Sequence, residues 1–250
     1  MIIAFIFAGG YDKMNIKINS ERNHLIMKIT WLGQAGLLFE TDGMKIIVDP
    51  YLSDSVEKIN SKNKRRVPVD ESFLKIVPDV IVLTHNHLDH TDPETLEHYL
   101  KNEKSITVLA PVSAWENVRT FGGKHNYIRF NRHSEFTIGN IRFIAVKAEH
   151  SDVHPIGVII EAENKRYYVT GDTLYNTEIF DDITDKIDVM FVPVNGVGNN
   201  MNMTDAKRFT EKINPEIVVP MHCGLFDGLD MNDFEVQNKI VPEIYKEIKL

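Results

Sequence analysis

Thr84-His85-Asn86-His87-Leu88-Asp89-His90 is the stretch that decides the fold. It places three imidazoles and one carboxylate within six consecutive positions, directly after the largely apolar run 78–83. A run of this kind is typical of a strand that is covered on both faces. Ligand sites of open sheets lie beyond the carboxyl ends of such strands. We therefore expect a functional site where this strand ends.

The histidine stretch has the composition of a metal site. Side chains alternate along extended backbone, so His85 and His87 project to the same side and can reach one ion. A turn at Asp89 and His90 can present two further ligands to a neighbouring ion. Imidazole and carboxylate suit Zn²⁺, Mn²⁺ or Fe, and spacing does not choose among them. A lone histidine in a strand is more often a hydrogen-bonded core residue, but this density of ligands has no ready structural explanation.

Three later residues share this context, because each follows an apolar strand. They are His150 after the run 141–146, Asp172 after 167–169 and His222 after 217–220. Each alone is weak evidence, but together they would complete two coordination shells. His154 lies four positions after His150 and is the competing candidate for that ligand.

Composition limits the function classes. The formal net charge of −8 disfavours a chain that holds nucleic acid by bulk electrostatics. Cys223 is the only cysteine beside ten histidines, so an intrachain disulfide is excluded and any metal site must use nitrogen and oxygen. A buried free thiol and a cytoplasmic location are expected.

The N-terminal segment differs from the remainder. Residues 2–8 are apolar but lack a preceding Lys or Arg, and about 20 residues are needed to span a bilayer. We expect residues 1–26 to be an extension, strand-like in part, and residues 27–250 to form one domain without membrane association. A homo-oligomer stays open.

Strand and helix patterns alternate along the rest of the chain, which predicts an α/β protein with two inner sheets and outer helices. Asp92 and Pro93 are typical of a helix start, and Asp230 predicts a helix that extends to about residue 246. Residues 53–70 are polar and are expected to form a long loop. Its basic residues either face solvent or border the pocket and steer an anionic substrate: Lys58, Lys62, Lys64, Arg65 and Arg66.

The chain carries the pattern His-x-His-x-Asp-His, followed by a single His, a single Asp and a final His. This order of ligands resembles the metallo-β-lactamase fold hydrolases. The resemblance covers about residue 27 to the C-terminus. Secondary motifs look like the branch related to L-ascorbate-6-phosphate lactonase: Trp31-Leu32-Gly33-Gln34-Ala35-Gly36, Val48-Asp49-Pro50, Asn195-Gly196, Gly198-Asn199-Asn200-Met201-Asn202 and Val219-Pro220-Met221-His222.

The resemblance implies a four-layer αββα sandwich of two mixed sheets flanked by helices. It also implies one or two divalent ions, with zinc or manganese ahead of iron. One ion would be held by His85, His87 and His150, the second by Asp89, His90 and His222, with Asp172 bridging them. Asp89 would also hold water and shuttle a proton, while Asn195 and Asn202 would line the substrate pocket.

These residues predict hydrolysis by a metal-bound hydroxide, and the resemblance favours a small anionic lactone or ester as substrate. A phosphodiesterase on the same fold is the strongest competitor. A secreted β-lactamase would often carry cysteine in place of Asp172, and a flavodiiron-type redox protein a carboxylate in place of His87. A nuclease of the group would usually carry an added domain. A non-catalytic metal-binding or redox protein is the alternative of another class.

Overall fold

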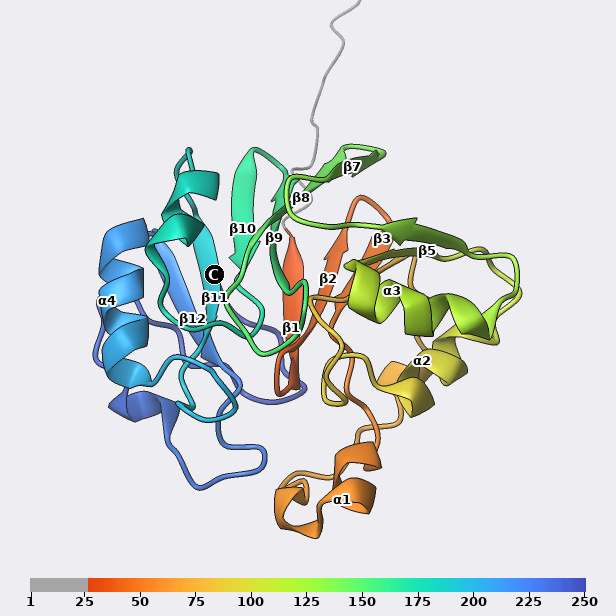
Figure 1. The fold of residues 1–250 in the computed structure, drawn as a ribbon, viewed down its shortest axis with the longest axis horizontal. Coiled ribbons are helices and arrows are strands. Elements are labelled where there is room, and N and C mark those ends of the chain that lie inside the picture. The colour runs from red at the N-terminus through yellow and green to blue at the C-terminus, as the bar shows by residue number, and fades with distance from the viewer. Residues whose placement is uncertain (1–26) are drawn as a thin grey trace, which may run out of the picture.

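The computed structural model describes residues 27–250, so the extension expected at residues 1–26 lies outside the described residues. Two six-stranded sheets pack face to face at the centre of the molecule (Figure 1). The first contains, in spatial order, β1 (Lys28–Gly33), β2 (Gly36–Thr41), β3 (Met44–Val48), β4 (Val80–Val82), β5 (Thr107–Ala110) and β6 (Asn126–Arg129). The second contains β12 (Ile217–Met221), β11 (Val189–Pro193), β10 (Lys165–Val169), β9 (Ile156–Ala162), β8 (Ile141–Lys147) and β7 (Glu135–Ile138).

Both sheets are mixed. Strands β1, β2 and β3 are antiparallel neighbours, whereas β3 to β6 are parallel. In the second sheet β7 to β10 are antiparallel and β10 to β12 are parallel. Parallel strands are usually covered on both faces, which explains why the short strand β4 is buried along its whole length.

Three apolar clusters hold the layers together. The inner faces of the sheets meet around Phe39, whose ring packs edge-on against Tyr167 at 6.1 Å and Phe191 at 5.8 Å between centroids. Helices α2 (Pro93–Leu100) and α3 (Val112–Val118) cover the outer face of the first sheet, and α4 (Met203–Ile213) covers that of the second (Figure 1). The predicted αββα sandwich is confirmed.

The start of α2 follows the sequence prediction. The Asp92 carboxylate accepts hydrogen bonds from the backbone N–H groups of Glu94 and Thr95, and Pro93 occupies the first turn. The helix therefore begins immediately after the histidine stretch and fixes its far end.

Two predictions about irregular segments were wrong. Residues 53–70 contain the short helix α1 (Ser55–Ile59) and a 3₁₀ turn at Ser61–Asn63 rather than a plain loop. The helix expected after Asp230 is only the 3₁₀ turn Met231–Asp233. Pro242 lacks an N–H and disfavours helical backbone at the preceding residue.

The C-terminal segment instead runs along the edges of both sheets as irregular backbone with two isolated β-bridges. The Ile240 N–H donates to Val218 O at 2.9 Å at the edge of the second sheet, and the Ile248 N–H donates to Ile29 O at 2.7 Å at the edge of the first. These bonds cover the edge strands β12 and β1, which would otherwise expose unpaired backbone groups. Among residues 27–250, no helix has the length and apolar character required to cross a bilayer.

Candidate metal centre

Four strand ends converge on one site. Strand β4 leads into the histidine stretch, β8 precedes His150, β10 precedes Asp172 and β12 ends next to His222. Gly171 makes the approach of the two sheets feasible, because a Cβ there would lie 2.7 Å from Ile156 O and 3.0 Å from the Thr84 side chain. Its φ of +63° also favours glycine. The residue before Asp172 thus lets β10 approach the end of β4.

The first ligand group is formed by His85, His87 and His150, which each offer a nitrogen within 4.8 Å of the others. His150 Nε2 lies 3.0 Å from His87 Nδ1. The competing candidate His154 is exposed and belongs to none of the described ligand groups. The structure therefore brings His150, and not His154, to the histidine stretch.

The second group is formed by Asp89, His90 and His222, again within 4.8 Å. Asp172 lies between the two groups. Its Oδ2 is 3.2 Å from His222 Nε2, 3.4 Å from His90 Nε2 and 3.8 Å from His150 Nε2. One carboxylate oxygen thus faces imidazoles of both groups, which is the arrangement that a bridging ligand requires.

Two buried atoms show that the donor set suits a cation. His85 Nε2 and Asp172 Oδ1 have no hydrogen-bond partner among the described residues, although both are shielded from solvent. Buried polar atoms are normally satisfied, and leaving one unpaired is costly. A divalent cation coordinated by nitrogen and oxygen would satisfy both, so the residues present fit a metal centre.

The electrostatics of the cluster point the same way. Burial lowers the pKa of His222, but Asp172 and Asp89 outweigh this effect and raise it to about 10. Burial and the neighbouring His90 hold the pKa of His85 well below its usual range. Burial raises the pKa of Asp89, yet His90 and His222 overcome it and the pKa falls well below the ordinary value. The carboxylates therefore favour positive charge in the cluster, and protons on the imidazoles compete with a cation for the same ring nitrogens.

Asp49 supports the histidine stretch from behind, a role that was not predicted from the sequence. Its carboxylate accepts hydrogen bonds from the Thr84 N–H at 2.8 Å and the Thr84 hydroxyl at 2.6 Å. Its Oδ2 also lies 2.8 Å from His90 Nδ1. A carboxylate on one ring nitrogen orients the other nitrogen toward the cluster. The signal was available, because Asp49 directly follows β3, the parallel neighbour of β4.

Gln34 and Asn195 perform a similar role around His222. Gln34 Nε2 donates to Asp89 Oδ2 at 2.9 Å, and its backbone oxygen accepts from the His222 N–H at 3.0 Å. Asn195 Nδ2 lies 3.0 Å from His222 Nδ1. The turn between β1 and β2 thus holds both Asp89 and His222 in place.

A cavity of about 610 Å³ opens onto the cluster. Asn195 lines it, as do Asn199 and Asn200, which were not predicted. The Asn200 amide donates to Asp172 Oδ2 at 2.9 Å. Asn202 does not line the cavity, and that prediction was wrong. Its side chain is the N-cap of α4 and accepts from the Asp205 N–H at 2.9 Å, which is ordinary chemistry for asparagine before a helix.

The basic residues of segment 53–70 do not line this cavity, although Val56 and Asn63 of the same segment do. Lys58 pairs with Glu94, Lys64 lies 3.7 Å from Glu57, and Arg66 donates to Asp227 O. Arg65 is buried, and donates to Tyr51 O at 2.9 Å and to the Tyr245 hydroxyl at 2.7 Å. Among residues 27–250, no lysine or arginine lines the cavity.

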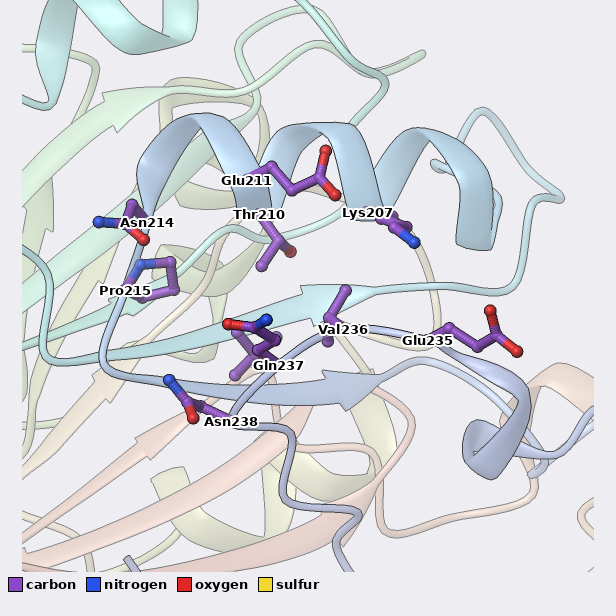
Figure 2. Close-up of a pocket in the computed structure, with 10 residues that line it drawn as sticks. Lys207, Thr210, Glu211, Asn214, Pro215, Glu235, Val236, Gln237 and Asn238 are labelled. Carbon is purple, nitrogen blue, oxygen red and sulfur yellow. The ribbon is translucent and has the colours of Figure 1, made fainter.

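A second cavity of about 490 Å³ lies between α4 and the C-terminal segment (Figure 2). The Thr210 side chain of α4 points toward Gln237 across it in Figure 2. No histidine or cysteine lines it within the described part of the chain, so it offers no comparable donor set. Cys223 is buried beside the main site, as expected, and burial raises the pKa of its thiol to about 12.

Comparison with known proteins shows the family of the chain. The Beta-lactamase superfamily domain matches residues 28–222. A UPF0173 metal-dependent hydrolase of Staphylococcus epidermidis is 31% identical over 232 residues, covering 86% of this chain and 93% of the relative. The chain belongs to this family of the metallo-β-lactamase superfamily. A UPF0173 protein of Pyrococcus furiosus is 32% identical over 227 residues, with 89% and 97% covered.

Solved structures support the fold of this UPF0173 member. The metallo hydrolase Igni18 from the hyperthermophilic archaeon Ignicoccus hospitalis superposes with a TM-score of 0.73 at 24% identity, covering 89% of this chain and 97% of Igni18. Superfamily membership makes the chain a metal-dependent hydrolase. The metal and the substrate have to be argued from the site.

Proposed function

We propose that this hydrolase cleaves a small lactone or ester, as the lactonase-like motifs imply. His85, His87 and His150 would hold one divalent ion, and Asp89, His90 and His222 a second, with Asp172 shared. Zinc or manganese fits this donor set, and iron is the less favoured choice. When bound, such ions lower the pKa of a coordinated water toward about 7 and polarise the carbonyl oxygen of the substrate.

The position of Asp89 carries this proposal. Asp89 lines the cavity with about a fifth of its side chain exposed, whereas His85 and His90 are fully buried. Gln34 holds Asp89 Oδ2, and His222 Nε2 lies 3.3 Å from the same oxygen. The carboxylate is thus fixed at the boundary between the ligand cluster and the substrate space.

The hydrogen bond from Gln34 and the nearby His222 ring favour the ionised form of Asp89, so the carboxylate starts the reaction without a proton. It can accept the proton of the attacking water while the water oxygen adds to the carbonyl carbon. When the C–O bond of the ester breaks, Asp89 returns the proton to the leaving oxygen. The products are a carboxylic acid and an alcohol, which remain one molecule if the substrate is a lactone.

Phosphodiester cleavage is the competing reaction. A phosphodiester carries a formal negative charge throughout the reaction, whereas an ester develops charge on one oxygen only. Proteins usually place Arg or Lys against phosphoryl oxygens. Neither lines the cavity within residues 27–250, and this favours the ester.

The test combines metal analysis with a substrate panel. Protein purified without added metal is measured by elemental analysis and assayed on lactones, aryl esters and phosphodiesters. We expect bound zinc or manganese, and a kcat/KM for the preferred lactone or ester at least about tenfold above that for any phosphodiester. A clear preference for phosphodiesters would overturn the proposal.

A further inference from the structure

The cavity of about 610 Å³ that opens onto the ligand cluster is called the main cavity, and the cluster forms its floor. The outer part of this cavity differs in chemistry from the floor. Val56 of α1, Val197 and Phe226 line the cavity together with the ligand cluster. They come from three segments that are distant in sequence. Val197 lies between Gly196 and Gly198 and is 61% exposed, although a valine of this exposure gains nothing from its own packing. These three residues are called the apolar rim.

The charges near the apolar rim would not favour an anion. The only charged side chains that line the cavity, apart from the histidines, are the carboxylates of Asp89, Asp172 and Asp227, as far as the described residues extend. Asp227 Oδ1 accepts the Gly224 N–H at 2.8 Å and the Leu229 N–H at 3.0 Å, so the acidic group is fixed in position. The adjacent Arg66 binds the backbone oxygen of Asp227 and not its carboxylate.

The remaining polar contacts available to a substrate are neutral. Asn63 and Asn199 line the cavity alongside the rim, and Ser151 adds a hydroxyl. Neutral amides can bind a carbonyl or a hydroxyl group, but they do not compensate a full negative charge as Arg or Lys would. The positive charge needed for an anion would thus come only from metal ions held by the ligand cluster at the floor.

From this distribution we propose that the part of the substrate that does not react is uncharged and apolar, such as a short alkyl or acyl chain seated on Val56, Val197 and Phe226. This assignment rests on the proposed esterase or lactonase reaction and specifies its substrate class. It replaces the anionic substrate expected from the sequence. The reacting carbonyl would lie at the floor and the chain would extend toward the rim.

Matched substrates test the proposal on the metal-loaded enzyme. One series of aryl esters carries acyl chains that end in methyl, and a second series has the same lengths but ends in carboxylate. We expect kcat/KM to rise by about fourfold for each buried methylene in the neutral series. The carboxylate series should be at least about tenfold slower at equal length. Equal or faster cleavage of the carboxylate series would overturn the proposal.

The variant Val197→Lys adds the missing charge at the rim. We expect it to raise kcat/KM for the carboxylate esters about five- to tenfold and to lower that for the neutral esters. Val153→Lys adds the same charge at an exposed valine that does not line the cavity, and should change neither series by more than about twofold. Equal effects of the two variants would contradict a contact at the rim.

Binding measurements separate this proposal from the reaction class. Unreactive ether analogues of both series are titrated by calorimetry. Tighter binding of the neutral analogues with no ester cleaved would support the apolar site and overturn the proposed esterase reaction. Ester cleavage with tighter binding of the carboxylate analogues would support the reaction and overturn the apolar site. Light scattering completes the test, because a dimer that dissociates on Val197→Lys would assign the rim to a second copy and overturn the proposal.

Discussion

The floor and the rim of the main cavity are built in opposite ways. At the floor, His85, His90 and Asp172 are buried, and each contacts other members of the cluster or its supporting residues. At the rim, Val197 is mostly exposed. Ile59, which belongs to the same helix α1 as the rim residue Val56, is 80% exposed. The floor is fixed by strand ends, whereas the rim depends on α1 and two connecting segments.

This difference separates the chemistry from the specificity. Four strand ends from two packed sheets determine where the ligands lie, so the floor follows from the fold itself. Connecting segments can change without disturbing the sheets, and they carry the residues that contact substrate. The superfamily membership therefore accounts for the metal-dependent hydrolysis, and the substrate has to be derived from the rim.

The largest effect is expected from His87→Ala. His87 belongs to the first ligand group and also lines the cavity. Its removal should reduce bound metal to a minor fraction and lower kcat by about 10³-fold or more, because the reaction depends on the metal. Elemental analysis and initial rates measure both quantities.

His154→Ala is the matched control for this substitution, since His154 is exposed and belongs to none of the described ligand groups. It should leave metal content and rate unchanged. Undiminished metal and activity in His87→Ala would contradict the ligand assignment.

A smaller effect at the floor is expected from Asp49→Asn. The substitution keeps the shape of the side chain but removes the negative charge beside His90 Nδ1. Loss of such a supporting carboxylate typically weakens metal affinity by about 10–100-fold. Competition with a chromophoric chelator measures the affinity, and excess metal should restore most of the rate.

Asp182→Asn provides the comparison. Asp182 is also a largely buried carboxylate, but it pairs with Arg132 at 2.7 Å and belongs to none of the ligand groups found in residues 27–250. It should lower the melting temperature without changing metal affinity. If both variants lost stability alone, Asp49 would have only a structural role.

The sequence predicts the floor better than the rim for a physical reason. The ligands lie at the ends of apolar strands, and both the strands and the ligand spacing are local patterns that a single sequence displays. Asp49 could have been assigned by the same reasoning, since it ends a neighbouring strand. His150, Asp172 and His222 were selected because each follows an apolar strand, but their division between two ions came from the family pattern, since the pairing of distant strands is not visible locally.

The wrong predictions have two causes, which are long-range contacts in one case and a local helix cap in the other. The segment after Asp230 has polar and apolar residues compatible with a helix, but its backbone bonds to the edge strands β12 and β1 instead. Asn202 was attributed to substrate because of its Gly-rich context, whereas the adjacent helix uses it as a cap. For the basic residues of segment 53–70 the sequence left solvent exposure and substrate steering open, and none of them lines the cavity.

The smallest effect is expected from Lys62→Ala, and it sharpens the contrast between rim and surroundings. Lys62 is exposed on the segment that contributes Val56 and Asn63 to the cavity, but it does not line the cavity. An exposed charge that makes no contact in the cavity acts through water, whose high dielectric constant weakens its effect. We therefore expect kcat/KM for a carboxylate ester to change by less than about twofold between 20 and 200 mM salt in both wild type and variant.

A larger fall of kcat/KM in Lys62→Ala that disappears in high salt would show that segment 53–70 steers anions. In that case the apolar rim would bind the neutral part of the substrate, and the surrounding basic residues would attract its charged part. Val197→Lys should then increase a rate for carboxylate esters that the wild-type charges already support, because it would not supply a missing contact.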